Sequence, residues 1–159
     1  MFYFLFFLLL TGDRFFSGLG VDRNPRLAFR SYLAAAEAGL VRAMNSVGCL
    51  HLRGTGVPVN TEEAQRWFRK SSEQGDQEGA YLLATLLDDR VASSRRRLLL
   101  HTRSNDEAYR VAVVRTMREI ESLLLRASKA GHSASMNALG SLCVSIFIFL
   151  FPFYSSSCF

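Results

Sequence analysis

The sequence is poor in the residues from which catalytic and metal sites are usually built. It has three cysteines and three histidines in 159 residues, without a Cys-x-x-Cys pair, a His-Glu-x-x-His motif or two histidines four residues apart. It therefore supports neither a disulfide framework nor a zinc site, and we expect no metal and no cofactor. Cys49 and His51 lie two positions apart on a predicted helix, so they face different directions and cannot form a nucleophile–base pair.

Strand patterns and phosphate-binding motifs are also missing. No segment alternates apolar and polar residues as a half-buried strand does. The glycine pairs Gly18-Leu-Gly20 and Gly54-Thr-Gly56 are not followed by Gly-Lys-Ser or a third spaced glycine. The acidic pairs Glu62-Glu63 and Asp88-Asp89 are adjacent at predicted helix ends, which is typical of caps and solvated charge. Because no residue constellation supports catalysis, we expect a non-enzymatic protein.

The charge is positive but dispersed. The net charge is +5, with 19 basic and 14 acidic residues. Most arginines stand singly on predicted helices beside Glu or Asp, which indicates a solvated face and disfavours a nucleic-acid partner. Arg95, Arg96 and Arg97 form the only dense basic run. This run is a candidate contact for an acidic protein surface, RNA or acidic lipid, although three arginines are a small footprint.

What the chain does contain is an internal repeat of 36 residues. Shifting Gly12–Gly39 onto Gly48–Gly75 aligns eight pairs of like residues, which are Gly12/Gly48, Gly18/Gly54, Gly20/Gly56, Val21/Val57, Asn24/Asn60, Ala28/Ala64, Tyr32/Phe68 and Gly39/Gly75. A period between about 20 and 50 residues is typical of solenoids and repeat arrays. Such proteins act through extended binding surfaces more than through catalytic pockets.

The second unit predicts a helix pair joined by a glycine turn. Three residues define one face of its first helix: Ala43, Val47 and Leu50. Gly48 lies within this helix at a cost of about 1 kcal/mol relative to Ala, which indicates close approach of a partner helix. Gly54-Thr-Gly-Val-Pro58 ends the helix and turns the chain, and Val57 is expected to pin this loop to the core.

The second helix of this unit has a predicted cap, stripe and end. Asn60 or Thr61 caps its first turn. Its buried stripe is predicted to contain Ala64, Trp67, Phe68 and Ser71. Gly75 closes the helix.

The neighbouring units are less regular. In the first unit Asn24-Pro25 opens the second helix, and the first helix has to come from the apolar N-terminal run. In the third unit the second helix is predicted at Ile120–Ala130, after an insertion at about residues 88–110 that lacks the glycine turn. A fourth unit begins near Ser133.

The string Ala43-x-x-x-Val-Gly-x-Leu-x-x-x-Gly-x-Gly-Val57, followed by Ala64-x-x-Trp-Phe-x-Lys-x-x-x-x-Gly75, resembles the Sel-one-like repeat family. The family is related to tetratricopeptide repeats. The resemblance implies an all-α fold, a right-handed α-solenoid of antiparallel helix pairs. The sequence departs from the family pattern at two places. His51 stands where the family often has Tyr, and Ser71-Ser72 stand where it usually has Ala-Ala. Family members act as adaptors in membrane-protein degradation complexes and in signalling.

Three regions follow from this organisation. Residues 1–11 are an apolar segment, either the first helix of a repeat or a targeting segment; residues 12–141 are the repeat solenoid; residues 142–159 are again apolar. Leu142–Tyr154 alone is shorter than the roughly 20 residues that span a bilayer, and residues 134–154 just reach that length. Three interpretations of this C-terminal region are compatible with the sequence: a membrane contact through residues 134–154, a packed terminal helix and a truncated repeat. The sequence is likewise compatible with a cytoplasmic, a membrane-associated or a secretory location.

These observations predict a scaffold that presents a concave surface to a protein or peptide. The first helix of each unit is expected to line that surface. Arg42, Asn45 and Arg53 are its candidate binding residues because they lie off the apolar stripe of their helix. The alternative is a membrane-tethered adaptor of a membrane-protein quality-control or degradation complex.

Overall fold

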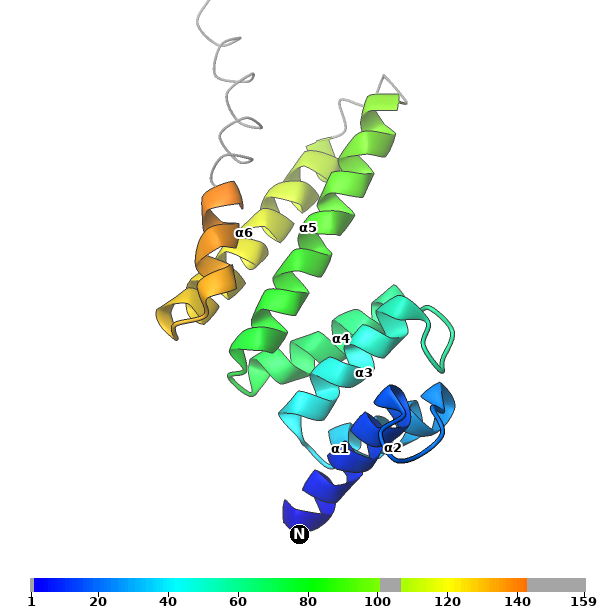
Figure 1. The fold of residues 1–159 in the computed structure, drawn as a ribbon. Coiled ribbons are helices and arrows are strands. Elements are labelled where there is room, and N and C mark those ends of the chain that lie inside the picture. The colour runs from blue at the N-terminus through cyan, green and yellow to red at the C-terminus, as the bar shows by residue number, and fades with distance from the viewer. Residues whose placement is uncertain (1, 101–106, 143–159) are drawn as a thin grey trace, which may run out of the picture. The chain divides into compact units, whose positions relative to one another are not determined.

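The computed structural model describes residues 2–100 and 107–142, and throughout these ranges its regular elements are α-helices (Figure 1). The elements in order are α1 (Phe2–Ser17), α2 (Pro25–Glu37), α3 (Val41–Arg53), α4 (Thr61–Glu73), α5 (Gln77–Leu100), α6 (Glu107–Lys129) and a further helix over residues 133–142. The all-α fold predicted from the sequence is confirmed. Most of the predicted C-terminal apolar segment, residues 143–159, lies outside the described residues.

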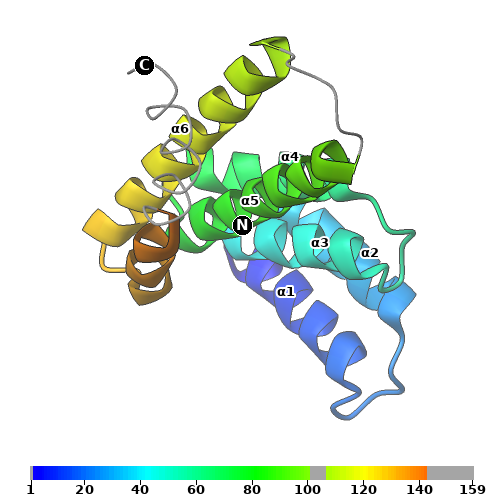
Figure 2. The same cartoon turned by 90° about the horizontal axis from the view of Figure 1, so that it is seen from above.

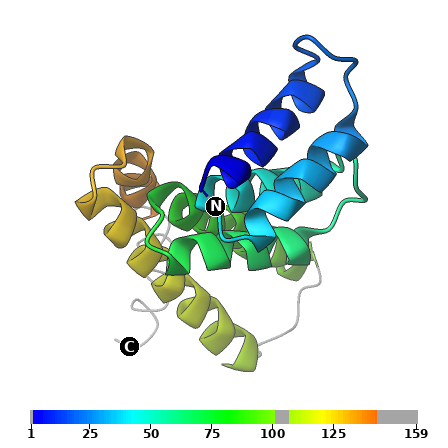
Figure 3. The ribbon, with the colours of Figure 1, turned by 90° about the horizontal axis from the view of Figure 1, so that it is seen from below.

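The chain divides into two compact units, Met1–Leu83 and Ala84–Phe159. In the first unit α1 packs antiparallel to α2, α3 packs antiparallel to α4, and α2 lies against α3 (Figure 1). The views from above and below show the turn between α3 and α4 beside the start of α2 (Figures 2 and 3). The first unit is therefore two stacked helix pairs, the arrangement predicted from the 36-residue repeat.

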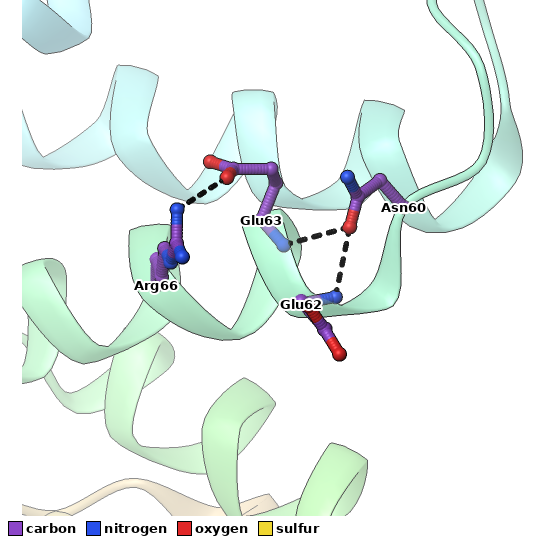
Figure 4. A network of polar contacts seen from close by, with 4 residues as sticks. All are labelled: Asn60, Glu62, Glu63 and Arg66. Carbon is purple, nitrogen blue, oxygen red and sulfur yellow. Dashed lines mark hydrogen bonds and ion pairs between the residues drawn. The ribbon is translucent and has the colours of Figure 1, made fainter.

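Asparagine caps start the second helix of each pair. Asn24 accepts a hydrogen bond from the backbone N–H of Leu27 at 3.2 Å. Asn60 accepts two, from the N–H groups of Glu62 at 3.1 Å and Glu63 at 3.0 Å (Figure 4). These bonds satisfy N–H groups that have no partner inside the helix, so α2 and α4 begin where the sequence predicted.

Glycines end helices where the sequence placed them. Gly54 follows α3 in the left-handed region at φ 67°, and Gly75 follows α4 at φ 87°. Gly56 also has a positive φ of 78°, and a methyl group there would collide with the carbonyl of Pro25 at the start of α2. The second glycine of the turn is thus needed both for its backbone conformation and for the packing of one repeat on the next.

The core of the first unit follows the predicted stripes. It contains Leu9, Ala28, Tyr32, Ala35, Ala36, Ala43, Met44, Val47 and Leu50, with Val57 packed against it. Ala64, Phe68 and Ser71 of α4 are fully buried. Trp67 differs from the prediction because it is only partly buried, and the ammonium of Lys70 lies over its ring, 4.6 Å from the centroid.

The second unit contains the long helices. α5 has 24 residues and α6 has 23, where α3 and α4 have 13 each. The predicted insertion falls on the end of α5 and the start of α6, and residues 101–106 between them lie outside the described residues. α6 contains the helix predicted at Ile120–Ala130, and three of its residues there, Ile120, Leu124 and Ala127, are buried. Among the helices that can be described, none combines the length and apolarity needed to cross a bilayer.

Candidate protein-binding groove

A groove of about 280 Å³ in the first unit runs along the exposed side of α3. Six of its lining residues belong to that helix: Arg42, Asn45, Ser46, Cys49, Leu50 and Arg53. The others come from α1, α2 and the start of α5: Phe16, Tyr32, Glu78 and Leu82. The groove is thus lined mainly by the first helices of successive repeats.

The three candidate residues predicted on α3 all line this groove. Arg42 and Arg53 are exposed, whereas Asn45 is half-buried. The two arginines lie eleven positions apart, about three helical turns, so both point to the same side of α3. The other predicted contact, Arg95–Arg97, lies on α5 in the second unit, where the side chains fall outside the described residues.

A hydrogen-bond network holds Asn45 in place. Its Nδ2 donates to Oδ2 of Asp76 at 2.7 Å. The same carboxylate oxygen accepts from the Ser71 hydroxyl at 2.9 Å and from the Gly79 backbone N–H at 2.7 Å. Asn45 Oδ1 is buried and accepts no hydrogen bond within the part of the chain that is described. Asn45 is therefore mainly a structural residue at the floor of the groove.

The floor also contains a buried tyrosine. Tyr32 is 4% exposed and its hydroxyl donates to Oδ1 of Asp13 at 2.6 Å. Burial, reinforced by this hydrogen bond and by the charge of Asp13, raises the pKa of Tyr32 well above its ordinary value. The phenol is therefore a fixed neutral group that orients α1 against α2.

Cys49 carries the one thiol among the groove residues. Burial raises the pKa of its thiol, with Glu78 adding to the increase and Arg53 opposing it. A raised pKa lowers the thiolate fraction at neutral pH and so lowers the reactivity of the sulfur. Within the described residues, no group of three His, Cys, Asp or Glu side chains is arranged to hold a metal ion.

Seven groove residues were not predicted as binding residues: Phe16, Tyr32, Ser46, Cys49, Leu50, Glu78 and Leu82. Leu50 was assigned to the apolar face of its helix, and no local spacing links the other six, which come from four helices. The repeat register carried the only usable signal, since the first helix of each unit was expected to line the binding surface. His51 is buried against Phe29, with ring centroids 5.2 Å apart at 87°.

The family model described as Sel1 repeat matches residues 8–40 and 41–76. Residues 8–76 therefore form two consecutive Sel1 repeats. Both matches lie in the first unit and correspond to the helix pairs α1–α2 and α3–α4. Sel1 repeats are typically protein-interaction scaffolds.

Two solved structures of Sel1-type repeat proteins are similar to this chain. A Sel1 repeat protein from Oxalobacter formigenes matches with a TM-score of 0.65 and 26% identity, over 84% of this chain and 46% of that one. A protective antigen present in uropathogenic Escherichia coli strains, which displays an SLR fold, matches with a TM-score of 0.65 and 27% identity, over 85% of this chain and 25% of that one. These similarities confirm the predicted solenoid fold class.

Two curated relatives from Arabidopsis thaliana also match part of the chain. The ERAD-associated E3 ubiquitin-protein ligase component HRD3A is 36% identical over 63 residues, and HRD3B, which has the same description, is 32% identical over 60 residues. The matches cover 40% and 38% of this chain, which spans only 9% and 10% of the two relatives.

Proposed function

We propose that this protein is a non-enzymatic scaffold that binds an extended peptide segment of a protein partner in the groove along α3. The observation that supports this proposal is the convergence of Arg42, Asn45 and Arg53 on one groove of about 280 Å³. The proposal needs no catalytic group, and the chemistry of the groove is that of a binding surface.

The groove has chemically distinct regions. Leu50, Leu82 and Phe16 provide an apolar surface for a side-chain anchor of the ligand. Arg42 and Arg53 are exposed and carry positive charge, while Glu78 is also exposed and carries negative charge. A ligand that combines an apolar anchor with carboxylates placed near the two arginines complements these features.

A charge-reversal pair tests the proposal. Peptides are first selected against the full chain from a random displayed library, and their Kd values are then measured by fluorescence anisotropy. The variant Arg42→Glu with Arg53→Glu should weaken binding of groove ligands by about tenfold or more, equivalent to about 1.4 kcal/mol. The matched control is Arg26→Glu with Arg30→Glu, since both are exposed on α2 and neither lines the groove.

A second variant distinguishes the groove from the basic run. Reversing Arg95, Arg96 and Arg97 to Glu should leave the peptide Kd unchanged if the groove is the binding site. Loss of binding in that variant, together with full binding by the Arg42/Arg53 variant, would assign the contact to the basic run. Circular dichroism of each variant checks that the helices are retained.

The second candidate function is an adaptor within a membrane-protein degradation complex. It is favoured by the two Arabidopsis relatives, which are described as components of an ERAD-associated E3 ubiquitin-protein ligase. In this case an apolar segment, residues 1–11 or 134–154, would tether the repeats to a membrane. Tagged protein should then stay in the membrane pellet after an alkaline carbonate wash, and its release into the supernatant would contradict the tether.

A further inference from the structure

The outer face of α1 is apolar and exposed. Phe6 is 57% exposed, Phe7 61% and Leu10 45%. A cavity of about 400 Å³ opens on this face, lined by Phe7, Leu10, Thr11, Arg14, Phe15 and Val21. Solenoid faces without a neighbouring repeat are usually polar, because an apolar face of this kind favours association.

The internal repeat identifies what covers the corresponding face of the next unit. The residues 36 positions later in the chain are Ala43, Ser46, Val47, Leu50, His51 and Val57. Four of them, Ala43, Val47, Leu50 and His51, are buried. Phe7 is 61% exposed where Ala43 is 0% exposed, so the two faces share a register and differ in whether they are covered.

The helix that packs on α3 at this face is α2. The ring of Phe29 on α2 meets His51 edge-on, and the position equivalent to His51 on α1 is Phe15, which lines the cavity. The space around the two equivalent turn glycines, Gly20 and Gly56, differs in the same way. A methyl group at Gly56 would collide with Pro25 of α2, whereas a methyl group at the equivalent Gly20 would meet nothing within 4 Å.

We propose that this face of α1 is the docking site for an amphipathic helix of the α2 type. The occupant packs an alanine-rich stripe with one aromatic residue into the cavity, as α2 packs on α3. Its first turn lies over Gly20, where the space equivalent to that occupied by Pro25 is open. This surface does not include any residue of the groove along α3, so the inference stands independently of the proposed function.

One difference makes the site selective. Arg14 lines the cavity and is exposed, where the equivalent Leu50 is 4% exposed in the core. A helix that docks here gains by placing a carboxylate or free carbonyl near this guanidinium. The two equivalent faces therefore prefer different helices, although their backbone geometry is shared.

The test uses the full chain and a peptide of its own residues 22–40, which contain α2 and its Asn24 cap. Because a free helix of this length is marginal in water, the peptide is closed by a lactam bridge between positions 26 and 30, which are exposed in the protein. Fluorescence anisotropy measures binding to the protein and to two variants. Phe7→Glu places a charge in the cavity, and Val59→Glu places one at a similarly exposed apolar residue outside it.

We expect saturable binding that Phe7→Glu weakens by about tenfold or more and Val59→Glu leaves unchanged. A peptide with Phe29→Ala should also bind more weakly, since that ring is the one that α2 places against His51. Absence of saturable binding, or binding that Phe7→Glu does not alter, overturns the proposal.

Two further measurements identify other occupants of the same face. Co-sedimentation with vesicles of phosphatidylcholine and phosphatidylserine that needs Phe7, without peptide binding, would overturn the helix assignment in favour of a lipid surface. Sedimentation equilibrium that shows a dimer lost in Phe7→Glu, again without peptide binding, would overturn it in favour of a second copy held by another segment.

Discussion

Two glycines inside helices each face an aromatic ring of the partner helix. A methyl group at Gly12 would lie 2.7 Å from a ring carbon of Tyr32, and one at Gly48 would lie 2.5 Å from a ring carbon of Phe68. Both rings are buried, so neither can move away without repacking its surroundings. The glycine and the ring recur together at a spacing of 36 residues, because the ring occupies the space that a side chain at the glycine position would need.

Gly48→Ala should therefore destabilise the protein, although Ala is the better helix former by about 1 kcal/mol. Overpacking against the Phe68 ring is expected to cost about 1–3 kcal/mol. Urea unfolding followed through Trp67, the only tryptophan, measures the effect in the same repeat.

Gly140→Ala is the matched control for this change. Gly140 also lies within a helix, and a methyl group there would have nothing within 4 Å. This variant should keep or raise the helix stability, as measured by thermal unfolding in circular dichroism. A lower free energy of unfolding for Gly140→Ala than for Gly48→Ala would contradict the packing argument.

Tyr32 stands where the next repeat has Phe68, so Tyr32→Phe fits the same space. The change removes the hydrogen bond to Asp13 and should cost about 0.5–1.5 kcal/mol near pH 7. Because the folded state raises the pKa of this phenol, its contribution is complete below the ordinary tyrosine pKa of about 10 and is lost as the pH rises above it.

Thermal unfolding from pH 8 to pH 11 checks this sign. The wild-type melting temperature should fall more steeply above pH 10 than that of Tyr32→Phe, so the two curves converge. Absorbance at 295 nm should show one of the five tyrosines ionising late in the wild type alone. Parallel melting curves across this range would count against a perturbed Tyr32.

The departure from the family pattern at Ser71 has a local explanation. Ser71 and Gly79 stand where the preceding repeat has Ala35 and Ala43. A methyl group at Gly79 would collide with the Ser71 hydroxyl, which bonds Asp76. The serine and the glycine are therefore a matched exchange, in which the larger side chain in one helix requires the smaller residue in the next.

At the scale of elements, comparing the two turn glycines distinguishes the cost of backbone strain from the contribution of packing between repeats. Gly20 and Gly56 have nearly the same conformation, with φ of 75° and 78°. Ala at either position should cost about 1–2 kcal/mol for its left-handed backbone. Gly56→Ala should cost about 1–3 kcal/mol more, because only its methyl group meets Pro25.

The comparison needs chemical denaturation of both variants, followed by circular dichroism with the wild type alongside. The difference between the two variants isolates the contact between the turn of one repeat and the helix of the repeat before it. Equal losses of stability in Gly20→Ala and Gly56→Ala would show that this contact contributes little.

Much of each element was predictable because its signals are local. The glycines at 54 and 75 and the asparagines at 24 and 60 mark helix ends through their own backbone and side-chain chemistry, and α2, α3 and α4 follow them. The lengths of α5 and α6 were not predictable in the same way, since the insertion carries no glycine turn to divide it.

At the scale of the molecule, the stacking of helix pairs could be predicted from the repeat, but the make-up of the groove could not. Arg42 and Arg53 were found because both lie on one helix and share its face. Glu78 and Phe16 join them only through the packing of three helices, which no spacing in the sequence encodes. Trp67 was placed too deep because helical periodicity alone does not show where the core ends.

One oxygen atom, Oδ2 of Asp76, binds a side chain of α3, a side chain of α4 and the backbone of α5. Elements of two successive repeats are therefore tied to the same oxygen, and opening any one of them breaks a hydrogen bond to it. The amide hydrogens of α3 and α4 should consequently exchange with deuterium through one shared opening reaction, with equal maximum protection. In Asp76→Ala the protection of the two helices should diverge, and peptide-level mass spectrometry resolves the difference. Unequal protection already present in the wild type would contradict this coupling. With equal protection, the repeats behave as one cooperative unit of hydrogen exchange, whose size is set by a single carboxylate.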